Sequence, residues 1–232
     1  RAVTPYYDDG GVTLYHGDCL DVLPTLRAAS IHSVITDSPY VIGAVSSGAM
    51  ASKSGGWGDM MNSALWFTSW YKMAARTLKP DGAMWTFLNW RTLPVVMRAA
   101  VDSEWPIASL AVWDKQWIGP GGSVGLRPSY EMIALLPRPN FAVADRGVAD
   151  VLRHKVGSYK PNGHPAEKPV GLVHRLMEIS TLAPGSVVLD PFLGSGTTAV
   201  AAKQHGLRCI GIEAEERYCE IIAARLAQGV LL

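Results

Sequence analysis

The amino-acid sequence predicts an α/β fold in which helices cover both faces of a mostly parallel β-sheet. Apolar runs of strand length alternate with helix-length segments in the last third of the chain, the pattern of βαβ units. The predicted strands 107–113 and 129–136 have no helix between them, so they should pair antiparallel. A chain of 232 residues that is 48% hydrophobic can bury the core of one such domain. We expect seven strands, including one antiparallel edge strand, in a single domain over 1–232.

The first 102 residues predict three strands separated by helices. Apolar, β-branched runs are typical of strands at 12–15, 32–37 and 83–88. Between them, residues 42–58 are rich in Gly and Ser, which favours a flexible loop just after the second strand. The expected helices are 19–27, 59–78 and 91–102. In the second of them the tryptophans recur at helical spacing, which indicates core positions.

The rest of the chain continues the alternation. A Gly- and Pro-rich stretch, 115–128, joins the two strands that should pair antiparallel. After residue 166 the expected helices are 167–182, 196–205 and 215–228, and the expected strands are 186–190 and 207–213. The intervening stretch 137–165 is too short for a separate recognition domain.

The overall charge is nearly balanced, so any basic surface must be local. The chain has 21 Lys and Arg against 20 Asp and Glu, a net charge of +1, which neither supports nor excludes a nucleic-acid partner. The stretch 151–169 is locally basic, because Arg153, Lys155, Lys160 and Lys168 face the single acid Glu167. A phosphate-binding surface and a solvated loop both fit this charge pattern.

The three cysteines and the distribution of apolar residues indicate where in the cell the protein is located. Cys19, Cys209 and Cys219 are an odd number without metal-ligand spacing, which indicates a reducing environment and no metal site. The sequence contains no apolar run of about 18–20 residues, so we expect no membrane span. We therefore expect a cytoplasmic protein.

Two short motifs follow buried strands. Asp37-Ser38-Pro39-Tyr40 comes after the first of these strands, and residues 190–198, Asp-Pro-Phe-Leu-Gly-Ser-Gly-Thr-Thr, come after the second. Open α/β sheets bind ligands at the carboxyl ends of their strands. The first motif offers a carboxylate, carbonyl groups and an aromatic face, and the second offers a glycine turn at a helix N-terminus. Together they predict a planar, amino-bearing substrate beside a nucleotide-like cofactor, as in a methyltransferase that acts on exocyclic amines.

The glycine turn fits a nucleoside better than a phosphate. A P-loop needs a lysine where Thr197 stands, and a dinucleotide fingerprint needs a third glycine that Ala199 and Val200 do not provide. Glu213 ends the next strand, where an acid can accept hydrogen bonds from both hydroxyls of a ribose. Glu213 can also cap the helix that follows, and the two roles are compatible.

The two motifs resemble those of a known family. Residues 188–198, preceded by His-Pro-Ala-Glu-Lys-Pro at 164–169, are similar to the S-adenosylmethionine region of the β-group DNA amino-methyltransferases, which methylate adenine N6 or cytosine N4. In that family the catalytic motif also precedes the cofactor motif. The resemblance covers nearly the whole chain and implies a Rossmann-like methyltransferase fold.

The resemblance also implies which residues bind S-adenosylmethionine. Asp18 and Cys19 would border the adenine, Glu213 would hold the ribose and Lys168 would reach the carboxylate. The methionine end would be surrounded by Phe192, Gly194, Gly196, Thr197 and Thr198, and Asp37, Asp190 and Ser195 complete the expected cofactor set.

The first motif supplies the expected catalytic groups. The Asp37 carboxylate and the Ser38 carbonyl can accept the two hydrogens of an amine, so that its lone pair attacks the methyl group. Pro39 stiffens this turn, and Tyr40 offers a face on which the base stacks. The family pattern usually has proline at the second position, where this chain has Ser38. The carbonyl role survives that difference, because every residue carries the group.

These features together predict a DNA methyltransferase that acts on adenine N6 in a base rotated out of the duplex. In the family a leading acid usually accompanies adenine. Cytosine N4 is the alternative, as is a weakly active or non-catalytic DNA-binding homologue. Related enzymes that act on RNA or on glutamine side chains share the four-residue motif but generally carry the cofactor motif first. The motif order of this chain argues against such an enzyme.

Double-stranded DNA is the expected partner, in a bacterial or bacteriophage-infected cell. The expected DNA contacts are Arg127, Arg138, Arg153, Lys155 and Lys160, with 137–165 as a short target-recognition segment. Because this segment is small, a second subunit in a homodimer is one way to complete the recognition site.

Overall fold

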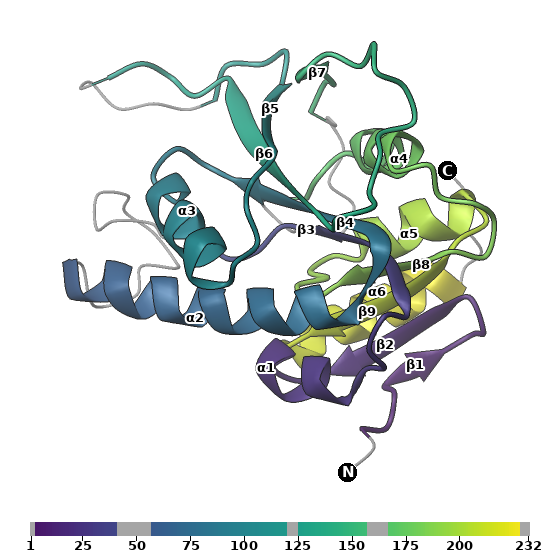
Figure 1. The fold of residues 1–232 in the computed structure, drawn as a ribbon. Coiled ribbons are helices and arrows are strands. Elements are labelled where there is room, and N and C mark those ends of the chain that lie inside the picture. Colours follow the sequence, from purple (N-terminus) through teal and green to yellow (C-terminus); the bar gives the residue numbers. More distant parts are fainter. Residues whose placement is uncertain (1–2, 41–56, 120–124, 157–166, 228–232) are drawn as a thin grey trace.

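A computed structural model describes residues 3–40, 57–119, 125–156 and 167–227. Within these residues nine strands form one sheet in the order β1-β2-β9-β8-β3-β4-β6-β5-β7. Helices α1, α2 and α3 cover one face of the sheet, and α4, α5 and α6 cover the other (Figure 1). The predicted fold class, a Rossmann-like α/β sheet between two helical layers, is confirmed.

The centre of the sheet is parallel, as expected. It consists of β2 (Val12–His16), β9 (Arg208–Glu213), β8 (Val187–Asp190), β3 (Ile31–Thr36) and β4 (Leu78–Leu88). Most residues of β3, β4 and β8 are buried, because helices pack on both faces of the sheet. The carboxyl ends of these strands therefore meet along one edge of the sheet.

Two details of the predicted sheet are corrected. The strands β5 (Ser109–Asp114) and β6 (Tyr130–Pro137) pair antiparallel as expected, but β6, the reversed strand of this pair, lies between β4 and β5 and is not at the edge. Its interior residues 132–136 are all buried, which suits a strand with a neighbour on each side. The antiparallel strand at an edge is the first strand of the sheet. Two short strands were not expected, β1 (Tyr7–Asp8) beside β2 and β7 (Val151–Arg153) beside β5.

The helices match the expected ones with shifted ends. Pro24 follows the short helix α1 (Cys19–Val22), which continues as the 3₁₀ turn η1 (Leu23–Thr25) instead of running to residue 27. Pro169 similarly precedes α4 and delays its start. As a result α4 spans Val170–Ile179, shorter than the predicted 167–182. The remaining helices follow the prediction closely: α2 (Trp57–Thr77), α3 (Leu93–Asp102), α5 (Thr197–Gln204) and α6 (Glu216–Ala227). The predicted loop 42–58 lies outside the described residues except for 57 and 58, which begin α2.

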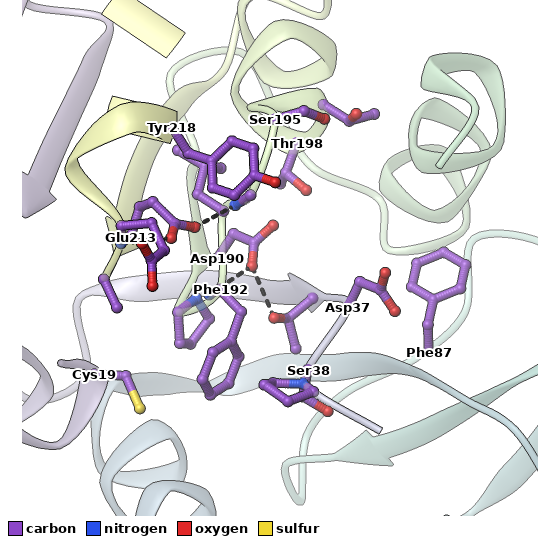
Figure 2. Close-up of a pocket in the computed structure, with 18 of the residues that line it drawn as sticks. Cys19, Asp37, Ser38, Phe87, Asp190, Phe192, Ser195, Thr198, Glu213 and Tyr218 are labelled. Atoms are coloured by element: carbon purple, nitrogen blue, oxygen red, sulfur yellow. Dashed lines mark hydrogen bonds between the residues drawn. The ribbon is translucent and has the colours of Figure 1, made fainter. Parts of the chain in front are cut away.

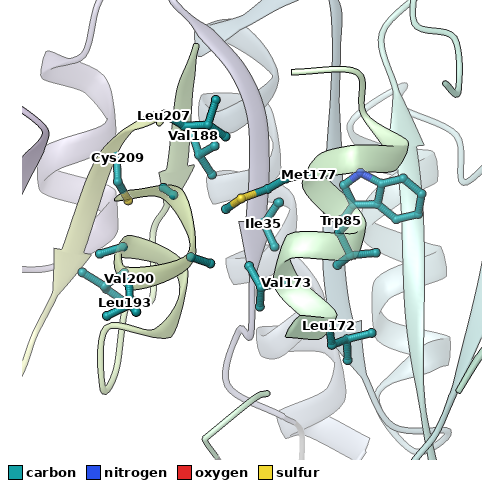
Figure 3. Close-up of a cluster of buried hydrophobic side chains, with 14 of the residues drawn as sticks. Ile35, Trp85, Leu172, Val173, Met177, Val188, Leu193, Val200, Leu207 and Cys209 are labelled. Atoms are coloured by element: carbon teal, nitrogen blue, oxygen red, sulfur yellow. The ribbon is translucent and has the colours of Figure 1, made fainter. Parts of the chain in front are cut away.

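The core consists of two apolar clusters, one on each face of the sheet. On the face covered by α4, α5 and α6, Val173 and Met177 of α4 pack with Ile35 of β3 and Val188 of β8 (Figure 3). On the other face the aromatic residues of α2 dominate, and Trp70 is fully buried as its spacing predicted. These clusters fix the strand ends around which the site is built.

Candidate active site

A cavity of about 680 Å³ opens at the carboxyl ends of β3, β8 and β9. Figure 2 shows Glu213 and Cys19 at one end of it, Asp37 and Phe87 at the other, and Asp190 between them. Of the predicted site residues, the cavity wall includes Asp18, Cys19, Asp37, Ser38, Pro39, Tyr40, Lys168, Asp190, Phe192, Gly194, Ser195, Thr197, Thr198 and Glu213. The sheet therefore brings both predicted motifs to one site.

Gly196 is a predicted cofactor residue that does not line the cavity. It is the N-cap of α5 and has a φ of 87°, a left-handed conformation that side chains rarely adopt. A Cβ atom at this position would lie 3.1 Å from Cγ1 of Ile222 on α6. Gly196 thus shapes the turn and allows α6 to pack closely behind it.

Glu213 is fixed by two backbone donors. Its Oε2 accepts a hydrogen bond of 2.7 Å from the Gly194 N–H, and its Oε1 accepts one of 2.9 Å from the Glu215 N–H. The second bond matches the predicted capping role. A carboxylate has about four lone-pair sites, so both oxygens keep acceptor capacity toward the cavity.

Asp190 joins β8 to β3 at the centre of the cavity. Its Oδ1 accepts hydrogen bonds from the Thr36 hydroxyl at 2.7 Å and from the Phe192 N–H at 3.0 Å (Figure 2). The side chain is almost fully buried, and this burial raises the pKa of Asp190 to about 6, although the hydroxyl of Thr198 and that of Thr36 oppose the shift. The centre of the site thus carries a carboxylate that titrates close to neutral pH.

A network of charged side chains holds the first motif. Lys168 forms an ion pair with Asp37, and its Nζ also lies 3.3 Å from Oε2 of Glu131. Glu131 accepts a hydrogen bond of 3.0 Å from the Tyr40 hydroxyl and pairs with Lys115 at 2.6 Å. Burial would lower the pKa of Lys168, but the two carboxylates raise it, so the ammonium stays charged. Lys168 lines the cavity, and its charge is shared between two acids of the protein.

Two atoms of the first motif are buried without a hydrogen-bond partner in the described part of the chain. They are Oδ1 of Asp37 and Oγ of Ser38. An unpaired buried acceptor is costly, so such atoms are commonly paired when a ligand is present. Lys168 contacts Oδ2 of Asp37, so Oδ1 is the oxygen of this carboxylate that keeps its acceptor capacity.

Sequence reasoning missed several residues of the site. Trp66 was assigned to the core by its helical spacing, but it lines the cavity, with its ring 5.4 Å from that of Phe192. Tyr218 and Arg217 of α6 also line it. Glu131 carried no signal, because no motif surrounds it and its partners are distant in sequence.

Glu167 is another cavity residue to which sequence reasoning gave no ligand role. Its Oε1 accepts hydrogen bonds from Arg225 at 2.8 Å and from the Thr197 hydroxyl at 3.3 Å. Its Oε2 is buried and has no partner among the described residues. Arg225 also donates to the Ser195 carbonyl at 3.0 Å, so it ties Glu167 to the glycine turn.

The predicted DNA contacts differ in their surroundings. The Arg127 guanidinium donates to the carbonyls of Gly119 at 2.7 Å and Ile118 at 3.3 Å, so it stabilises its own loop. The Nε of Arg138 is buried. Arg153 and Lys155 are exposed, and Arg153 belongs to β7, which extends the sheet.

The structure bears on the remaining predictions only where it describes the residues concerned. Lys160 and the end of the predicted recognition segment 137–165 lie outside the described residues. Within the described part of the chain, no helix is long and apolar enough to cross a bilayer. The same residues contain no group of three or more His, Cys, Asp and Glu placed to hold a metal ion.

Comparison with known proteins gives consistent matches. A family model described as DNA methylase, for N6 and N4 methyltransferases, matches residues 31–224. The YubD protein of Escherichia coli (strain K12) is 33% identical over 213 residues, which cover 91% of this chain and 88% of YubD.

Two solved structures share the fold. The PvuII DNA methyltransferase, which is cytosine-N4-specific, superposes with a TM-score of 0.80 at 19% identity and covers 98% of this chain and 90% of its own. M1.HpyAVI in complex with SAM gives a TM-score of 0.72 at 21% identity, over 93% of this chain and 98% of its own. At such identities these structures establish a common fold.

Proposed function

Because this chain belongs to the N6/N4 DNA methylase family, whose model spans residues 31–224, we propose that it methylates adenine N6 in double-stranded DNA. The methyl donor is S-adenosylmethionine. The observation that carries the proposal is the unpaired, buried Oδ1 of Asp37, next to a lysine that holds the other carboxylate oxygen.

The cavity has the donors and acceptors that S-adenosylmethionine requires. Glu213 offers two acceptor oxygens to the ribose hydroxyls, and the rings of Trp66 and Phe192 offer apolar faces to an adenine. Asp190 and Glu167 supply negative charge for a ligand with two cationic groups, and the free Oε2 of Glu167 suits the methionine ammonium. When bound, the cofactor supplies an electrophilic methyl carbon. Lys168 is already paired with two acids, which favours an indirect role over a direct bond to the methionine carboxylate.

The first motif provides the groups that activate an amine. The lone pair of an exocyclic amine is delocalised into the ring, so the nitrogen must become pyramidal before it attacks. Oδ1 of Asp37 and the Ser38 carbonyl accept the two N–H hydrogens and favour that geometry. Lys168 keeps Oδ2 of Asp37 occupied, so only one oxygen turns toward the amine. Asp37 then accepts the proton that the methylated nitrogen loses.

Tyr40 and the exposed cations serve the DNA. The Tyr40 ring provides a stacking face for a base that has left the duplex, a step that costs a few kcal/mol. Arg153 and Lys155 are exposed and bind phosphates. Arg127 is a weaker candidate because its guanidinium already donates to two carbonyls, and Arg138 is weaker because its Nε is buried.

The choice of adenine rests on the leading acid Asp37. Cytosine N4 is the second candidate, since that amine has the same two hydrogens and the cytosine-specific PvuII enzyme shares the fold. The test is to incubate the protein with S-adenosylmethionine carrying a CD₃ group and with unmethylated DNA made by PCR. The DNA is then digested to nucleosides, which are weighed by mass spectrometry.

We expect labelled N6-methyladenine from the wild type and at least a 100-fold loss in Asp37→Asn, because the amide cannot accept the proton. Asp102→Asn, a half-buried residue at the end of α3 outside the cavity, is the matched control and should retain full activity. Labelled N4-methylcytosine alone would contradict the choice of base and leave the amine chemistry intact. The absence of any labelled nucleoside would overturn the proposal.

A further inference from the structure

Glu131 connects three chain segments beside the active site. It lies at the start of β6, with its side chain 16% exposed. Its two oxygens contact Lys115 just after β5, Lys168 before α4 and the Tyr40 hydroxyl after β3. Glu131 is not among the residues that line the cavity, so any effect it has on a ligand is indirect.

The charges around Glu131 balance. Two ammonium groups, those of Lys115 and Lys168, face two carboxylates, those of Asp37 and Glu131. A buried charge is costly unless it is paired, so each group limits the position of its partners. Without the Glu131 carboxylate, Asp37 would be the only acid in the set. Both ammonium groups would then compete for its oxygens, including the Oδ1 that must stay free.

Glu131 also fixes an aromatic ring. The Tyr40 hydroxyl donates to the same Oε2 that lies near Lys168, and the Tyr40 ring is 5.5 Å from the Lys168 ammonium. One carboxylate oxygen therefore contacts both the lysine that orients Asp37 and the ring that is placed to stack on a base.

We propose that Glu131 is a positioning residue for methyl transfer: through Lys168 it keeps Oδ1 of Asp37 free for the amine, and through the Tyr40 hydroxyl it fixes the stacking ring. This inference rests on the function proposed above. It assigns a role to a residue that neither touches the ligand nor belongs to either motif.

The test compares Glu131→Gln, which removes the charge and keeps the size, with Tyr40→Phe, which removes only the hydroxyl. Misplacement of reacting groups by about 1 Å costs on the order of 100-fold in rate. We expect kcat to fall about 100-fold in Glu131→Gln and about 5- to 10-fold in Tyr40→Phe, which loses one of the two contacts. The Kd for S-adenosylmethionine, measured by calorimetry, should stay within about threefold of the wild type in both.

Two further variants separate positioning from general damage. Glu131→Asp keeps the charge and should be more active than Glu131→Gln. Glu178→Gln, at an exposed glutamate of α4, should match the wild type. Folded Glu131→Gln and Tyr40→Phe proteins with kcat within twofold of the wild type would overturn the inference. A loss of cofactor affinity as large as the loss of kcat would also overturn it, because it would indicate a general disruption of the cavity.

The remaining outcomes are also decisive. If Glu131→Gln does not fold, the kcat of Tyr40→Phe decides the matter alone. If the wild type methylates no DNA, the proposed function fails. Crystal structures of the two variants then test whether Glu131 positions Lys168 and Tyr40. We expect a lysine ammonium to contact Oδ1 of Asp37 in Glu131→Gln and the residue 40 ring to rotate in Tyr40→Phe. Unchanged side-chain positions would overturn the inference.

Discussion

Asp190 shows how burial changes the chemistry of one residue. Hydroxyl and N–H groups, from Thr36 and Phe192 among others, hold its carboxylate between β8 and β3. They only partly replace the water that a charged carboxylate loses, so its pKa rises to about 6. The folded protein therefore binds a proton at this site more readily than the unfolded chain does.

Because the pKa of Asp190 is raised in the folded state, the free energy of unfolding should depend on pH in one direction. Between pH 4 and pH 6 the folded state holds more protons at Asp190 than the unfolded state, so this group adds stability at low pH and loses it as the pH rises through 6. Relative to Asp190→Asn, the wild type should gain about 1 kcal/mol in free energy of unfolding between pH 7 and pH 5. Urea denaturation of both proteins at the two pH values measures this difference. A difference that grows with pH instead would contradict the assignment.

Glu213 is the second residue whose role is testable alone. A hydrogen bond to a charged group contributes about 1.5–3 kcal/mol, so Glu213→Gln should lower the affinity for S-adenosylmethionine about 10- to 100-fold. Isothermal titration calorimetry measures the change. Glu216→Gln removes a carboxylate from the first turn of the following helix and should leave the affinity unchanged. Equal affinities of the Glu213 variant and the wild type would remove the ribose role.

At the level of elements, the sequence predicted those features that are determined by residues close together in the chain. Strand ends, the glycine turn and most helices follow from local patterns, so the residues of both motifs except Gly196 line one cavity. The order of β6 and β5 was not predictable, because either edge arrangement satisfies the same apolar pattern. Glu131 was missed for this reason, since only the observed strand order brings it to Lys168.

Trp66 illustrates a second limit. A helix with apolar residues on one side predicts a buried face but does not reveal where the sheet beneath it ends. Trp70 lies over the sheet and is buried, whereas Trp66, one turn earlier, reaches the cavity. Helical spacing alone does not distinguish these two positions.

The turn before α5 allows a comparison between two glycines. Gly196 and Gly206 both have positive φ, but only at Gly196 would a Cβ crowd Ile222. We expect Gly206→Ala to cost about 1 kcal/mol of unfolding free energy from backbone strain. Gly196→Ala should cost about 2–3 kcal/mol, because overpacking adds to the strain. Urea denaturation measures both values, and equal costs would show that the contact with α6 is unimportant.

For the whole molecule, the near-zero net charge makes local cations decisive. Arg153 is only loosely paired, 3.9 Å from Asp114, so its charge is available to DNA. Each phosphate contact adds about 0.9 to the slope of log K against log salt concentration. The double variant Arg153→Ala/Lys155→Ala should therefore flatten this slope by about 2.

Fluorescence anisotropy of a labelled duplex at several salt concentrations measures that slope. A control that removes two exposed arginines elsewhere, Arg98→Ala/Arg175→Ala, should leave it unchanged. If the two double variants have the same slope, the DNA binds to another face of the protein.

The position of β3 between β4 and β8 affects how the chain folds during synthesis. The bond between Thr36 and Asp190 joins residues 154 positions apart. At about 5–20 residues per second, a ribosome needs about 10–30 s to make the intervening chain. Throughout that interval one edge of β3 has no strand to pair with, and contacts of such long range form slowly. The cavity is therefore among the last parts of the molecule to form, because its lining is incomplete until the C-terminal third of this sequence has emerged.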